Sequence, residues 1–149
     1  MDSITVFYRE HRRIDQLASA LESLTRLPGP PDPGEFLGLR SSLGDLVMQH
    51  LIREERVIYA LLRASQRCGH RTLVGETVRD PAELCAAFAE YGRRWTGPRI
   101  AADWIGYCTE TGLILARLRQ RTAVEEEVVY PLIEREHMAE VERLLRHAV

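Results

Sequence analysis

The sequence predicts an all-α protein, an up-down-up-down four-helix bundle with a short C-terminal helix. Apolar residues recur every three or four positions along four long segments, and breaks rich in Pro and Gly separate those segments. No stretch alternates apolar and polar residues as a half-buried strand does. A chain of 149 residues that is 45% hydrophobic and 28% charged is long enough to build one packed core. We therefore expect residues 1–149 to form a single domain.

A sharp break separates the first two helices. The first is expected over residues 3–26, and the run Pro28-Gly-Pro-Pro-Asp-Pro-Gly34 ends it, because proline cannot continue a helix and glycine frees the backbone. The second helix is expected over residues 34–66. The residues on its apolar stripe are Phe36, Leu39, Leu43, Leu46, His50, Glu54, Val57 and Leu61.

A loop or irregular connection is expected over residues 67–80, and a shorter third helix follows it. Asp80 is suited to be the N-cap of that helix, with Pro81 at the first helical position. The helix is expected to end near Trp95, where Thr-Gly-Pro makes the next break. Its stripe comprises Leu84, Phe88, Gly92 and Trp95.

The fourth helix is expected over residues 99–130. Pro131 should kink or stop it, because the proline ring clashes with the preceding turn. A last short helix is expected over residues 134–146. The stripe of the fourth helix comprises Trp104, Tyr107, Thr111, Ile114, Leu118, Arg121, Glu125, Val128 and Leu132.

Five ionisable residues interrupt these otherwise apolar stripes. They are His11, His50, Glu54, Arg121 and Glu125. Burying a charge without a partner costs several kcal/mol, so these residues are expected to contact one another or a metal ion. One such histidine alone would more often be a structural core residue. Two carboxylates with two imidazoles are a typical ligand set for iron, and bundle cores hold such sets on facing helices.

A fragment of the second helix recurs in the fourth. The two copies are His50-Leu-Ile-Arg-Glu54-Glu55-Arg-Val-Ile-Tyr59 and Arg121-Thr-Ala-Val-Glu125-Glu126-Glu-Val-Val-Tyr130. A His and a Glu four residues apart lie on one face of a helix and can share a metal ion. An Arg in the place of that His cannot, because it stays protonated and has no lone pair. The repeat therefore indicates two half-sites, one of which has lost metal binding.

These motifs resemble those of the hemerythrin-like (HHE cation-binding) family. Its members carry a His on the first helix, His-x3-Glu on the second, a His on the third and His-x3-Glu on the fourth. The phrase His-x3-Glu-Glu-x3-[Tyr/Phe]-Pro is close to a family signature. This chain departs from it at Ala60, where Pro is usual, and retains Pro131 in the second copy. The resemblance covers nearly the whole chain and implies an iron-binding four-helix bundle.

Carried over residue by residue, the resemblance implies metal ligands at His11, His50, Glu54 and Glu125. The family's second iron would need His at the positions taken here by Gly92 and Arg121, and neither residue is a ligand. One iron ion is therefore expected rather than two, and a protein without metal is the alternative.

Arg121 suggests a substitute for the missing ion. Its guanidinium can bridge Glu54 and Glu125, so we hypothesise that it replaces the second iron electrostatically. The alternative is that the side chain extends past the core into solvent. Tyr59 and Tyr130, five residues beyond each site Glu, are expected to cap the end of the core rather than bind metal.

The remaining polar residues near these motifs are expected to be solvated. Glu126 and Glu127 should face outward or toward a neighbouring helix, as charge runs usually do. The other three histidines, His70, His137 and His147, are expected to be exposed to solvent.

Three classes of function remain open from the sequence. The first is a non-enzymatic iron-binding module with a binding or sensing role for oxygen, nitric oxide or iron. The second is a metal-free bundle that acts as a structural or regulatory interaction protein. The third, an iron-dependent oxidase or repair enzyme, needs an open coordination position and a substrate cleft, and no feature of the sequence indicates either.

The expected partners are a metal ion, a small gaseous ligand, and a second copy of the chain or another protein. Trp95 and Trp104 form either an apolar face for a dimer or part of the core, and the sequence leaves both alternatives open. The net charge of −2 gives no case for a nucleic-acid surface. No apolar run is long enough to span a bilayer, and the N-terminus lacks a signal-peptide pattern. Three widely spaced cysteines without a CxxC pair favour free thiols. A cytoplasmic protein is therefore expected.

Overall fold

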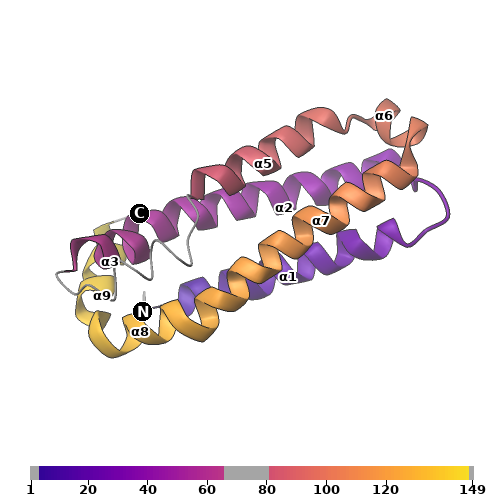
Figure 1. Ribbon diagram of the computed structural model, residues 1–149. Coiled ribbons are helices and arrows are strands. Elements are labelled where there is room, and N and C mark those ends of the chain that lie inside the picture. Colours follow the sequence, from indigo (N-terminus) through magenta and orange to yellow (C-terminus); the bar gives the residue numbers. More distant parts are fainter. Residues whose placement is uncertain (1–3, 66–80, 148–149) are drawn as a thin grey trace.

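Four long helices lie side by side and alternate in direction in a computed structural model, which describes residues 4–65 and 81–147 (Figure 1). α1 and α5 each contact α2 and α7, so the four helices close into a bundle. The predicted fold class, an all-α bundle with a short C-terminal helix, is confirmed. The helical segments are α1 Thr5–Thr25, α2 Pro33–Glu54, η1 Glu55–Tyr59, α3 Ala60–Ala64, α5 Pro81–Arg94, α6 Gly97–Ala102, α7 Trp104–Val124, η2 Glu125–Val129, α8 Tyr130–Glu136 and α9 Met138–His147.

Side-chain caps set the starts of α2 and α7. The Asp32 carboxylate accepts a hydrogen bond from the backbone N–H of Gly34 at 3.0 Å, and Asp103 accepts one from Gly106 at 2.9 Å. Asp103 has an extended φ of −142° and therefore separates α6 from α7. The prediction of one continuous helix over residues 99–130 was wrong at this point, because an aspartate there caps a new helix instead of continuing the old one.

Two π-helical turns, η1 and η2, begin within the two Glu-Glu pairs of the repeat, η1 at Glu55 and η2 at Glu125. The backbone N–H of Ala60 bonds to the carbonyl of Glu55, and that of Tyr130 bonds to Glu125, each across five residues. The chain continues as a helix through both turns. Pro131 does not stop the fourth helix, although stopping it was one of the two predicted outcomes, since α8 runs on to Glu136; the regular α-helix is instead interrupted by η2 just before the proline. The wide turn before Pro131 relieves the crowding that a proline ring causes in a regular helix.

Each π-turn contains one residue more than a regular turn, so it shifts the buried positions that follow by one. Val128 is 44% exposed, although the α-helical period predicted it on the buried stripe, and Val129 is fully buried instead. In the same way Ile133 is buried where Leu132 was predicted, and Leu62 is buried where Leu61 was predicted. Upstream of the turns the predicted stripes agree with the burial of the structure, within the residues described.

Two apolar clusters fill the bundle, one toward each end. The cluster at the α6 end is aromatic, with Tyr107 in ring contact with both Trp95 and Trp104. Trp95 is buried and Trp104 is partly buried against this cluster, so both belong to the core rather than to an apolar docking face. The second cluster, with Phe7, Val57, Tyr130 and Val141 among its members, lies beside the predicted metal ligands, since the Phe7 ring contacts His50 and the Tyr130 ring contacts His11.

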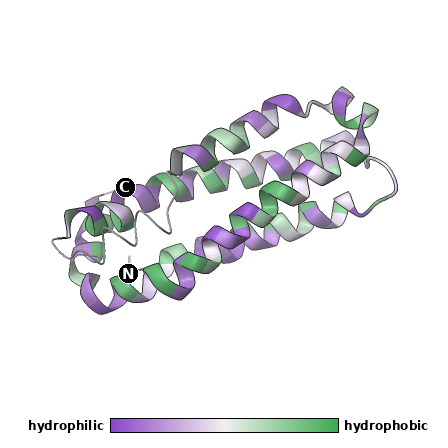
Figure 2. Cartoon of the chain, viewed as in Figure 1, coloured by the Kyte–Doolittle hydropathy of each residue, from purple (hydrophilic) through white to green (hydrophobic). Residues whose placement is uncertain are grey.

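Hydrophobic and hydrophilic residues alternate along every long helix of the bundle (Figure 2). In the described part of the chain, no helix combines the length and the apolar character that crossing a bilayer requires.

The register shift after η2 predicts that substitutions at two adjacent valines change the free energy of unfolding by very different amounts. Val129→Asn should lower the free energy of unfolding by about 3 kcal/mol, because it buries an amide without a partner and loses apolar contacts. Val128→Asn should change it by no more than about 0.5 kcal/mol, since that side chain faces solvent. Urea unfolding of both variants measures the difference. A larger loss at Val128 than at Val129 would mean that the π-turn is absent.

Candidate metal centre

The structure brings together the four residues that the sequence predicted as ligands. His11 comes from α1, His50 and Glu54 from α2, and Glu125 from the first position of η2. All four side chains are buried, and each offers one nitrogen or oxygen atom within 4.8 Å of the others. Imidazole nitrogens and carboxylate oxygens at such separations are able to enclose a single cation.

Both histidines are held by an outer carboxylate, which leaves the inner nitrogen of each ring facing the cluster. His11 Nδ1 lies 2.9 Å from Glu126 Oε1, and His50 Nδ1 lies 2.6 Å from Glu10 Oε2. Because an ionised carboxylate only accepts hydrogen bonds, both Nδ1 atoms carry the proton. Arg53 in turn pairs with Glu10. Metal-binding histidines in proteins usually have such a partner on the nitrogen that does not bind the metal.

Sequence reasoning missed the roles of Glu10 and Glu126. Glu126 is largely exposed, as predicted for its charge run, yet it reaches His11 across the gap between two helices. Glu10 directly precedes His11 on α1 but contacts the histidine of α2. Contacts of this kind depend on how helices cross, and no spacing in the sequence signals them.

The inner nitrogens of the two histidines face each other. His11 Nε2 and His50 Nε2 are 3.1 Å apart. With a proton on each Nδ1, both Nε2 atoms present lone pairs, and two lone pairs repel at this distance unless a proton or a metal cation lies between them. The pKa of His11 responds to this environment: burial by itself lowers it, but the contacts with Glu125 and Glu126 outweigh burial and raise it above the ordinary value.

Arg121 reaches into the cluster from α7 and contacts both site carboxylates. Its Nη2 donates a hydrogen bond to Glu54 Oε2 at 3.1 Å, and its Nε lies 2.8 Å from Glu125 Oε1 in a close ionic contact that is not aligned as a hydrogen bond. Only 10% of its side chain is exposed. The guanidinium also lies over the ring of Tyr59, 5.5 Å from its centroid. Arg121 therefore points inward, and the alternative in which it extends to solvent is wrong.

The two carboxyls of the cluster differ in their affinity for a proton. Burial, together with the charge of Glu125, raises the pKa of Glu54 to about 7 against the opposing effects of His50 and Arg121. Burial also favours the protonated form of Glu125, but contact with His11 and the charge of Arg121 outweigh it and lower the pKa of Glu125. When Arg121 is the only cation beside the two carboxyls, Glu125 is thus the one that stays ionised.

Two tyrosines donate to these carboxylates in a crossed arrangement. Tyr59, in the second-helix copy of the repeat, bonds to Glu125 Oε1 at 3.0 Å. Tyr130, in the fourth-helix copy, bonds to Glu54 Oε1 at 2.6 Å and lies 3.0 Å from His11 Nε2. A π-turn places residues five apart on one face, which is why both tyrosines point at the cluster. Both tyrosines are fully buried members of the core, and their hydroxyl contacts with the cluster come in addition to the predicted capping role.

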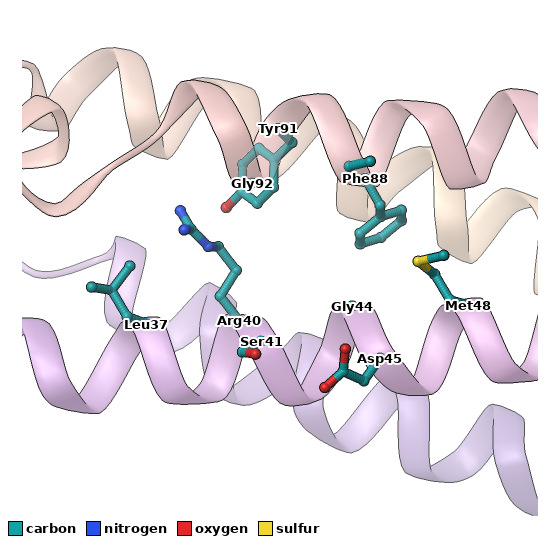
Figure 3. A pocket seen from close by; sticks show the side chains of 10 residues that line it. Leu37, Arg40, Ser41, Gly44, Asp45, Met48, Phe88, Tyr91 and Gly92 are labelled. Atoms are coloured by element: carbon teal, nitrogen blue, oxygen red, sulfur yellow. The ribbon is translucent and has the colours of Figure 1, made fainter.

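Gly92 lies far from this cluster, because the neighbouring Tyr91 bonds to Thr111, ten residues before Arg121 on α7. The prediction that Gly92 takes the place of the third-helix ligand was therefore wrong. Together with Arg40 and Gly44, Gly92 lines a hollow of about 230 Å³ between α2 and α5 (Figure 3). A Cβ atom at Gly92 would meet nothing within 4 Å. Since α5 begins at Pro81, Gly92 is about 16 Å along that helix at 1.5 Å per residue. Arg121 is thus the one replaced ligand position that the described residues place at the cluster.

The predictions that the other three histidines are exposed to solvent have different outcomes. His147 is exposed as predicted, whereas His137 is partly buried between α8 and α9, so that prediction was wrong. His70, Cys68 and the predicted Asp80 cap lie outside the described residues.

Comparison with known proteins agrees with the chemistry of the cluster. The family model of the hemerythrin HHE cation binding domain matches residues 2–133, which contain every residue of the centre. No curated protein and no solved structure matches the chain.

Removal of the Arg121 charge should destabilise the metal-free protein in a pH-dependent way. Arg121→Met leaves two buried carboxylates without their cation and should cost about 3 kcal/mol of unfolding free energy near pH 8. Without Arg121 the pKa of Glu54 rises further above its unfolded value of about 4.5, so stability falls as pH rises through that range and the cost shrinks near pH 5.5. Urea unfolding in the presence of a chelator at both pH values measures it.

Arg119→Met is the matched control for this experiment. Arg119 lies two residues earlier on α7 and pairs with Asp15 and Glu22 near the surface. Its removal should cost less than about 1 kcal/mol and show little pH dependence. Equal costs for the two variants would contradict the role of Arg121 as the internal cation.

Proposed function

Because the chain belongs to the hemerythrin HHE cation-binding family, we propose that it is a metal-binding module that holds one iron ion through His11, His50, Glu54 and Glu125. The observation that carries this proposal is the pair of facing Nε2 atoms, 3.1 Å apart, on two imidazoles whose outer nitrogens are held by carboxylates. That arrangement is repulsive when empty of positive charge and favourable around a cation.

The donor set supports iron as the ion. Two imidazoles with two carboxylates combine borderline and hard ligands, which is the composition that non-haem iron sites use. One carboxylate oxygen is also available for it: Glu125 Oε2 is buried, makes no hydrogen bond within the described residues, and lies 3.1 Å from His11 Nε2. A buried oxygen without a hydrogen bond is costly unless something binds it.

The surroundings of the carboxylates support one ion rather than two. Glu125 Oε1 already contacts Tyr59 and Arg121, and Glu54 Oε1 accepts from Tyr130. Neither carboxylate is therefore free to bridge two metals. The fixed charge of Arg121, which contacts both carboxylates, also repels a second cation.

Bound iron would supply redox chemistry and an attachment point for a small ligand, and a binding or sensing role for oxygen, nitric oxide or iron is the function proposed here. The chain's own residues orient the ligands and exclude water. His11 and His50 are both buried, and Phe7 packs edge-on against the His50 ring, so bulk solvent has little access to the two Nε2 atoms. Outer carboxylates at Glu10 and Glu126 fix the ring orientations.

A second candidate function has its own supporting observation. Arg121 contacts both site carboxylates, so the bundle can satisfy most of its buried charge without a metal. A metal-free protein with a structural or regulatory interaction role is consistent with that contact. Metal content decides between the two functions.

The purified full-length protein should contain about one iron per chain, measured by elemental analysis after aerobic purification. Ferrous iron at about 100 times its dissociation constant should stabilise the metal-free protein by about 2.7 kcal/mol, because the ion binds only the folded state. His50→Ala and Glu125→Gln should lose the ion, whereas His147→Ala, which alters an exposed histidine of α9, should retain it. A wild-type protein that neither contains metal nor gains stability from it would favour the metal-free function.

Iron binding should weaken as pH falls, because the ligands must lose their protons before they bind. The raised pKa of His11 and the raised pKa of Glu54 place this loss near neutral pH rather than in strong acid, and more than one proton should be released per ion. Glu126→Gln removes a carboxylate that holds the proton on His11, so it should move the midpoint to lower pH. Binding titrations at a series of pH values test both statements, and an affinity independent of pH would contradict them.

A further inference from the structure

The phenol of Tyr130 lies inside the cluster rather than beside it. Its Oη is 3.0 Å from His11 Nε2 and 2.6 Å from Glu54 Oε1, and the residue is fully buried. We propose that Tyr130 is a fifth protein ligand, whose phenolic oxygen binds the same ion as the two imidazoles and the two carboxylates. This inference rests on the proposed function, because it assumes that the cluster binds iron.

The distances around His11 Nε2 support this role. Three donor atoms lie at nearly equal distances from it: His50 Nε2 at 3.1 Å, Glu125 Oε2 at 3.1 Å and Tyr130 Oη at 3.0 Å. Adjacent ligands on a metal with bonds of about 2.1 Å are separated by about 3.0 Å when their bonds meet at right angles. Tyr130 therefore stands to His11 as the other two proposed ligands do.

The packing of the ring holds the phenol in this place. The Tyr130 ring stacks on the His11 ring, with centroids 5.2 Å apart and planes inclined by 25°. Tyr8 also packs edge-on against the Tyr130 ring, with centroids 5.1 Å apart. Because these two neighbours hold the ring, its oxygen remains directed at the cluster when the ion binds.

Tyr59 occupies the equivalent position of the repeat but lies on the other side of the carboxylates. Its Oη contacts Glu125 Oε1, which is the oxygen that also contacts Arg121, and its ring lies beneath the guanidinium. A cation on the histidine side is therefore within reach of Tyr130 and is separated from Tyr59 by Glu125. Tyr59 serves as a hydrogen-bond donor, and it provides a matched control.

The charge balance of a five-ligand site favours ferric iron. When Tyr130 binds, its O–H bond breaks, a metal–oxygen bond forms and the proton is released to solvent. Three anionic oxygens then surround the ion together with two neutral imidazoles, which suits a hard trivalent cation. A bound cation removes the negative field that otherwise keeps this phenol protonated.

The test compares wild-type protein with Tyr130→Phe and Tyr59→Phe, each freed of metal with a chelator and loaded with ferric iron alone. A phenolate bound to ferric iron absorbs visible light by charge transfer. The wild type and Tyr59→Phe should show this band, and Tyr130→Phe should lose it. Tyr130→Phe should still bind one iron per chain by elemental analysis, with an affinity about 10–100-fold lower.

Resonance Raman spectroscopy of the wild type gives a second readout that does not depend on any variant folding. Excitation within the visible band should enhance phenolate ring vibrations. Wild-type protein that binds iron without such a band, or a band that persists in Tyr130→Phe, overturns the role of Tyr130 and leaves the iron site standing. Wild-type protein that binds no iron overturns the proposed function and this inference together.

Discussion

The burial of two carboxylates, Glu54 and Glu125, between facing helices is the constraint to which the rest of the cluster responds. Two negative charges in a protein interior need positive charge close by. Arg121 supplies one fixed cation through its contacts with Glu54 Oε2 and Glu125 Oε1. Beside them the Nε2 atoms of two imidazoles face each other at 3.1 Å, an arrangement that a cation between them would stabilise. The bundle core thus combines one fixed positive charge with a place suited to a second cation.

The π-turns position the tyrosines that donate hydrogen bonds to the two buried carboxylates. Each turn brings a tyrosine onto the same face as the preceding site glutamate, and each tyrosine donates to the glutamate of the opposite copy. The two copies of the repeat are thereby joined across the core by hydrogen bonds as well as by apolar packing. Because Arg121 lies beside Tyr59 and His11 lies beside Tyr130, two tyrosines in equivalent positions meet different chemistry.

The proximity of the four proposed ligands and Arg121 could be predicted from sequence, because ionisable residues interrupted strongly periodic apolar stripes. The π-turns could not, since an α-helical period leaves no place for an extra residue; Val128 was therefore assigned to the core in error. Gly92 was misplaced for another reason. The level of α5 along the bundle depends on where that helix begins, and the sequence does not fix its start relative to α7. The contact of Glu10 with His50 depends on how α1 and α2 cross, so the spacing of residues in the sequence could not predict it.

A fixed guanidinium changes what loss of the exchangeable ion does to the protein. If both cations could leave, both carboxylates would be stranded together and the core would be strongly destabilised. Here Arg121 remains, Glu125 keeps its charge beside it, and Glu54 and His11 are the groups able to bind protons near neutral pH. Protons can therefore occupy the place of the ion without unfolding the bundle. This property would let a bound metal leave and return in the folded state, which the proposed function requires.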